Sequence, residues 1–111
     1  MNNEYKIETG KSFTAIIYIA GDKDVARQVC REYVDKGACV EVEECEYIFT
    51  GGTDKGVKVT MINYMRFPSE PKVIEDSAVE LAKILIEKLF QFSASVVTDE
   101  KSIFIMDGRK R

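Results

Sequence analysis

The segment INYMRFPSEP, residues 62–71, holds the side chains best suited to contact a ligand. Arg66 carries a forked set of donors that matches phosphate oxygens. Phe67 offers a ring face for stacking on a nucleobase, a contact that contributes about 1–3 kcal/mol. Asn63 has an amide that could hydrogen-bond a base edge or a ribose hydroxyl. These three side chains predict a ligand-binding site at the end of a strand.

Asn63 is the most informative of the three residues. In a strand over residues 57–67, its side chain points to the same face as Met61 and Met65, so its amide lies on an otherwise apolar face. A buried amide without partners costs about 1–3 kcal/mol, and polar residues at such positions are often functional. A structural interpretation stays open for each residue: Phe67 in the core, Arg66 at a solvated strand end, and Asn63 satisfied near the end of the sheet.

Tyr47 and Thr50 precede a glycine pair and could line the same end of the sheet as Arg66. In the predicted hairpin, however, residues near the loop oppose one another, so Phe49 pairs nearer to Val57 than to Arg66. Tyr47 and Thr50 therefore join the ligand site only if another protomer supplies them. This geometry predicts a pocket between protomers.

The composition narrows the possible chemistry. The chain contains no histidine, which excludes Ser-His-Asp triads, Cys-His pairs and most zinc sites. The acidic run Glu41, Glu43, Glu44 and Glu46 lacks the glycine turn and alternating ligands of a calcium loop. GGTDKG, residues 51–56, lacks the Gly-Lys-Ser/Thr spacing and the following helix of a phosphate loop, and is typical of a hairpin. We expect no cofactor, no metal site and no catalytic residue.

Length and charge limit the class of protein. The chain has 111 residues, which suits one domain over residues 1–111. A net charge of −3 argues against a broad nucleic-acid surface. No apolar run reaches the roughly 20 residues of a membrane span, and the N-terminus lacks a signal-peptide pattern. Three cysteines without a CxxC pair fit reduced thiols. We expect a cytoplasmic protein that binds neither extended nucleic acid nor membranes.

Hydrophobic patterning predicts six strands. They are expected at residues 4–8, 12–20, 38–50, 57–67, 94–98 and 102–106. In the third of these strands the apolar parity changes near Glu43 and Glu44, which predicts a β-bulge.

Two helices separate these strands. The first begins at GDKD, where Asp22 can cap it, and ends at Gly37. The second begins around Ser69 and Pro71 and carries the longest apolar stripe, which runs to Phe90. The acids near its N-terminus are predicted to be surface charges; they are Glu75, Asp76 and Glu80.

This order of elements predicts the fold class. Its centre is the split-βαβ pattern, so we expect an α+β protein with a mainly antiparallel sheet and both amphipathic helices on one face. An N-terminal strand and a C-terminal hairpin would be added to this ferredoxin-like core. The other face would carry Ile62, Tyr64 and one parity of strand 12–20. A half-apolar outer face predicts a homo-oligomer, at least a dimer, with Ile62 and Tyr64 at the interface.

The run YIFTGG, then GVKVTMINYMRFP, then a long amphipathic helix resembles patterns of small phage-encoded proteins. In size, two-helix layout and Lys/Ile/Glu-rich composition, residues 12–106 resemble the phage anti-Thoeris proteins that sequester cyclic ADP-ribose signals. The resemblance implies a non-enzymatic oligomeric sponge in the host cytoplasm, which counteracts host defence. It would bind a small anionic nucleotide-like ligand between protomers and leave it intact. Arg109, in the basic tail, could then supply a second phosphate contact.

Two alternatives from other classes stay open. The first is an interaction or inhibitor module that docks on a macromolecule through the face of Ile62 and Tyr64. The second is an enzyme whose carboxylate–lysine site is assembled between protomers.

Overall fold

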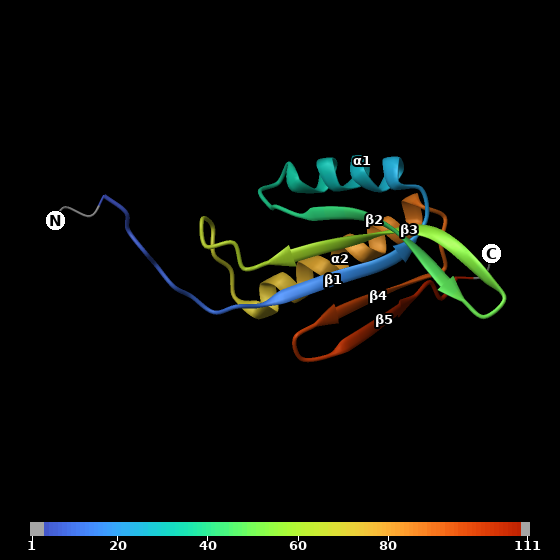
Figure 1. Cartoon of the computed structure of the whole chain (residues 1–111). Coiled ribbons are helices and arrows are strands. Elements are labelled where there is room, and N and C mark those ends of the chain that lie inside the picture. Colours follow the sequence, from blue (N-terminus) through green and yellow to red (C-terminus); the bar gives the residue numbers. More distant parts are fainter. Residues whose placement is uncertain (1–3, 110–111) are drawn as a thin grey trace.

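A computed structural model describes residues 4–109 of the chain (Figure 1). Five strands and two helices follow in the order β1 (Thr14–Ala20), α1 (Lys23–Val34), β2 (Glu41–Phe49), β3 (Gly52–Ile62), α2 (Pro71–Lys88), β4 (Ser93–Thr98) and β5 (Ser102–Met106). Every strand pairing is antiparallel, and the strand order is β2-β3-β1-β4-β5. The predicted α+β class with a split-βαβ core is confirmed, and β5 completes the C-terminal hairpin.

The core lies between one face of the sheet and the two helices. Alternate residues of β1 are buried, among them Ala15 and Ile17, because strand side chains point to opposite faces in turn. Helix α2 covers this face with Leu81 and Leu85, which are fully buried. Burying each leucine side chain contributes about 1.5–3 kcal/mol. None of the helices within residues 4–109 is long and apolar enough to cross a membrane.

The first helix begins as its sequence predicts. The Asp22 carboxylate accepts a hydrogen bond from the Val25 backbone N–H at 3.2 Å, which satisfies one free donor of the first turn of α1. The second helix begins at Pro71, and its N-cap residue, Glu70, makes no side-chain capping bond. Helix α2 ends at Lys88, and Phe90 lies outside the apolar stripe with 82% of its surface exposed. The predicted extension of the stripe to Phe90 is therefore wrong.

The β2–β3 hairpin contains no bulge. Its register runs without interruption from the Glu41–Thr60 pair to the Phe49–Gly52 pair. The turn is only two residues long, Thr50 and Gly51, and the rest of the predicted loop belongs to β3. The apolar side chains of β2 change from one face to the other because the strand extends past the start of α1. At that point Glu44 lies 3.9 Å from Lys23, the first residue of the helix. The predicted bulge is thus wrong, although the change of parity is real.

Two predicted strand boundaries are also wrong. Strand β3 ends at Ile62, and residues 63–70 form an irregular loop in which the Phe67 N–H donates to the Tyr64 carbonyl at 2.9 Å. Residues 4–13 form no strand, and they cannot pair beside the following strand β1, which has β3 on one side and β4 on the other. They extend from the body as an N-terminal arm (Figure 1).

Candidate functional site

The loop of residues 63–70 brings aromatic and charged groups together at one end of the sheet. The rings of Tyr64 and Phe67 lie 5.9 Å apart at an angle of 39°. Burial, followed by the neighbouring Cys39 thiol and the Glu41 carboxylate, raises the pKa of the Tyr64 hydroxyl to about 12. Tyr64 is therefore a neutral hydrogen-bonding phenol at physiological pH. The loop thus presents two neighbouring aromatic rings, and the negative charge of Glu41 acts on one of them.

Arg66 lies in this loop with its side chain exposed. Within residues 4–109 no carboxylate lies within ion-pair distance of its guanidinium. An arginine in this state can bind an external carboxylate or phosphate without first breaking an internal contact. The structure therefore leaves Arg66 and Phe67 accessible at the predicted place, and their role in ligand binding stays a prediction.

Asn63 serves the framework of the protein. Its Nδ2 donates to the Lys11 carbonyl at 2.7 Å, and its Oδ1 accepts from the Ser69 N–H at 2.9 Å. These bonds fasten the base of the N-terminal arm to the loop before α2. The parity argument for Asn63 fails because β3 ends one residue earlier. Its role in ligand binding is an untested prediction, and its amide is already engaged.

The remaining predicted site residues lie at the opposite end of the sheet (Figure 1). The Tyr47 hydroxyl donates to the Val57 carbonyl at 2.7 Å, and burial is the largest cause of its raised pKa. Thr50 is exposed in the β2–β3 turn. Arg109 is bound by the Asp107 carboxylate, with Nη2 at 2.9 Å from Oδ2, and also pairs with Glu87. One chain therefore does not bring Tyr47, Thr50 or Arg109 near Arg66.

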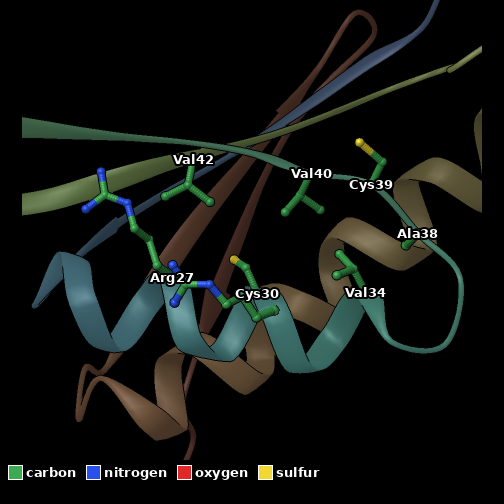
Figure 2. A pocket seen from close by; sticks show the side chains of 8 residues that line it. Arg27, Cys30, Val34, Ala38, Cys39, Val40 and Val42 are labelled. Carbon is green, nitrogen blue, oxygen red and sulfur yellow. The ribbon is translucent and has the colours of Figure 1, made fainter.

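A groove between α1 and β2 adds a feature that the sequence did not indicate. It has a volume of about 340 Å³, and Figure 2 shows Val40 and Val42 pointing toward the helix, whereas the Cys39 sulfur points away from it. The lining is largely apolar, with two arginines; the residues are Arg27, Cys30, Arg31, Val34, Ala38, Cys39, Val40 and Val42. Cys39 links the groove to the aromatic loop, because it lines the groove while its thiol, which points away from α1, interacts with the Tyr64 hydroxyl. Groove and loop together form the candidate site.

Ile62 and Tyr64 were predicted to lie at a subunit interface. Ile62 is on the face of the sheet away from the helices and is 41% exposed, whereas Tyr64 lies beyond the end of β3. Other apolar side chains on this outer face include Phe104 and Met106, which are 64% and 66% exposed. The interface role of Ile62 and Tyr64 stays a prediction.

The sequence interpretation also missed one buried carboxylate. Glu75, predicted to be a surface charge, is only 9% exposed, and its oxygens lie 3.4 Å from Lys101 and 3.9 Å from Lys72. The available signal was its place beside Ile74 at the edge of the apolar stripe of α2. Glu75 lies beside the C-terminal hairpin, outside the candidate site.

The cysteine in the floor of the groove should be unreactive. Burial raises the pKa of the Cys30 thiol to about 11, so very little thiolate forms near neutral pH. We expect iodoacetamide to modify Cys30 at least about tenfold more slowly than the half-buried Cys39 and Cys45. Peptide mass spectrometry of the native protein measures the three rates, with urea-unfolded protein as the control. Equal rates in the native protein would show that the groove opens to solvent.

Comparison with known proteins identifies the architecture. No family model and no curated protein matches this sequence. A solved structure of a phage SAM lyase in the apo state matches with a TM-score of 0.77 and 16% identity, over 97% of this chain and 100% of that one. A phage SAM lyase in complex with S-methyl-5'-thioadenosine matches with a TM-score of 0.69 and 15% identity, over the same shares. At these identities the likeness shows the fold.

This comparison corrects the functional prediction. The matching structures are those of a lyase, an enzyme, so it contradicts the expectation of a non-enzymatic sponge for a cyclic ADP-ribose signal. It also counts against the non-enzymatic interaction module. Neither structure is of the anti-Thoeris class, which leaves the resemblance to those proteins untested. The sequence interpretation failed because it took the lack of histidine as evidence against catalysis, although an enzyme with a carboxylate–lysine site had been left open.

Proposed function

We propose that this protein is an enzyme that cleaves S-adenosylmethionine or a related sulfonium nucleoside and releases S-methyl-5'-thioadenosine. The observation that carries the proposal is the match in fold to phage SAM lyase over 97% of this chain and the whole of the other. The nucleoside in the second matching structure indicates the kind of product. If the protein is phage-encoded, the host cytoplasm is its place of action.

The reaction makes modest demands on the protein. The bond between the sulfonium sulfur and the amino-acid carbon chain breaks, and its electron pair stays on sulfur as a neutral thioether. In the same step a carboxylate oxygen of the substrate attacks the carbon that loses the sulfur, so that the amino-acid part leaves as a lactone and no other reactant is needed. Because this leaving group is already activated by its positive charge, the main tasks are to bind the cation and to orient the amino-acid chain. A chain without histidine can perform both tasks with carboxylate, aromatic and guanidinium groups.

The candidate site offers a group for each part of such a substrate. The ring of Tyr64, and the Glu41 carboxylate whose charge helps to raise the pKa of the Tyr64 hydroxyl, suit the sulfonium cation, which an aromatic face attracts by about 0.5–2 kcal/mol. Arg66 suits the carboxylate of the amino-acid part. The apolar groove along α1 suits the adenine ring, with Arg27 and Arg31 at its side. A second copy of the chain could complete the site with Tyr47 and Thr50.

The direct test is incubation of the purified protein with S-adenosylmethionine, followed by chromatography and mass spectrometry. We expect S-methyl-5'-thioadenosine to accumulate in proportion to protein and time. S-adenosylhomocysteine is the matched control, because it has the same parts but a neutral sulfur, and it should persist. Recovery of unchanged S-adenosylmethionine at micromolar enzyme concentrations would refute the proposal.

A further inference from the structure

The two edges of the sheet differ in charge. Strand β2 carries four glutamates in nine residues, whereas β5, with the sequence SIFIM, carries no charged residue. An edge strand exposes unpaired N–H and C=O groups, and charged side chains are a common way to prevent another strand from pairing there. The edge of β2 is therefore protected, and the edge of β5 is open to an added strand.

The N-terminal arm has the pattern of a strand without a place in its own sheet. Ile7 is 85% exposed and Tyr5 is 83% exposed, and in an extended strand both side chains would point to the same face. The base of the arm is held firmly: the Asn63 backbone N–H donates to the Phe13 carbonyl at 3.2 Å, and a Cβ on Gly10 would lie 2.6 Å from the sulfur of Met65. These contacts direct the arm away from the body (Figure 1).

We propose that the N-terminal arm of one copy pairs, antiparallel, with the free edge of β5 in a second copy. In the register that we propose, Ile7 lies opposite Phe104 and Tyr5 lies opposite Met106, all on the outer face of the sheet. Cross-strand pairs of aromatic and aliphatic side chains stabilise a sheet, and this register covers the two most exposed apolar residues of β5. Residues 4–9, when extended, span about 20 Å, which is enough to pair along the five residues of β5, about 17 Å.

Charge favours β5 over β2 as the partner. With Ile7 on the outer face, Glu8 points to the inner face beside Ile103. The charges there balance, because three lysines lie among three acids, which are Glu75, Asp76 and Glu80. The same segment placed on β2 would set Ile7 and Tyr5 beside the outer-face carboxylates of that strand, since Glu41 and Glu43 occupy this face. Because β5 carries no charged residue, Ile7 can be buried there without being placed beside carboxylates.

Disulfide trapping between two differently substituted chains tests the pairing. Ile7→Cys and Phe104→Cys are prepared separately, each with Cys39→Ser and Cys45→Ser, and then mixed under mild oxidation. We expect a covalent dimer on a non-reducing gel, with a peptide that joins positions 7 and 104. Ser12→Cys replaces Ile7→Cys in the control, because residue 12 lies in the clamped base of the arm.

Each outcome decides the proposal. A covalent dimer from Ile7→Cys, and at least tenfold less from Ser12→Cys, supports it. The absence of a dimer in the mixture would overturn it. A chain that carries both Ile7→Cys and Phe104→Cys is the second check: a 7–104 disulfide that forms only within this single chain, and never between chains, would also overturn the proposal. Sedimentation gives an independent measure: Ile7→Asp should lower the oligomer mass at micromolar concentration, and Ser12→Asp should not. Neither measurement depends on catalytic activity, so failure here is distinct from failure of the lyase proposal.

Discussion

Replacing Arg66 by alanine should lower kcat/KM for S-adenosylmethionine cleavage by about 10- to 150-fold. The physical reason is that a hydrogen bond between charged groups contributes about 1.5–3 kcal/mol, and each 1.36 kcal/mol of transition-state stabilisation is a factor of ten in rate. The Arg66 side chain is exposed and has no ion pair with another part of residues 4–109. Its removal should therefore change the melting temperature by no more than about 4 °C.

The measurement combines steady-state kinetics with a thermal melt. Lys88→Ala is the control, because Lys88 is also an exposed cation but lies in the last turn of α2. Arg66→Lys keeps the positive charge but lacks the planar guanidinium that can form two parallel hydrogen bonds with a carboxylate. This variant should therefore be more active than Arg66→Ala and less active than the wild type. Unchanged kinetics would remove Arg66 from the site, and a large fall in melting temperature would make it a structural residue.

Replacing Gly56 by alanine should destabilise the fold by about 3 kcal/mol or more, a large part of the 5–15 kcal/mol that stabilises a domain. A Cβ at this position would lie 2.4 Å from the Ile19 carbonyl oxygen and 2.9 Å from the Ala20 Cα. It would also lie 2.5 Å from the ring of Tyr47. Because the first two atoms belong to the backbone of the central strand β1, they cannot move without disturbing the whole sheet.

Urea unfolding followed by circular dichroism measures this loss of stability. Gly108→Ala is the matched control, since nothing lies within 4 Å of its added Cβ. That variant should be neutral or more stable by up to about 1 kcal/mol, because alanine restricts the unfolded chain. If both variants unfold at the wild-type midpoint, the close approach of β3 to β1 at Gly56 is not needed by the fold.

Much of the fold could be predicted from the sequence because local patterns report directly on burial. The apolar residues that recur with helical spacing along α2 predicted a helix with Leu81 and Leu85 on its buried face, and both side chains are fully buried. The Asp22 cap and the C-terminal hairpin were also located correctly. Strand ends were less predictable: the alternation of side chains continues past Ile62, although hydrogen bonding stops there.

The candidate site could be predicted only in part. Arg66 and Phe67 were chosen for their chemistry, and they do lie in an exposed loop. The sequence interpretation missed the groove, because Arg27 and Cys39 are separated along the chain and meet only when β2 lies beside α1. It also missed the engagement of the Asn63 amide, since its partner, Lys11, is 52 residues away.

The sequence alone therefore determined the class of the fold, the order of its two helices and five of its strands, and the charges that β2 and β5 carry. These properties depend on spacing and residue type within a few turns of helix or strand. The tertiary structure decided which residues share a site. It placed Tyr47 near the β2–β3 turn and Arg109 beside Glu87 in the last turn of α2, whereas Arg66 follows the other end of β3. It also directed the N-terminal arm outward. Such distances depend on strand order and on contacts remote in sequence, which local periodicity does not encode.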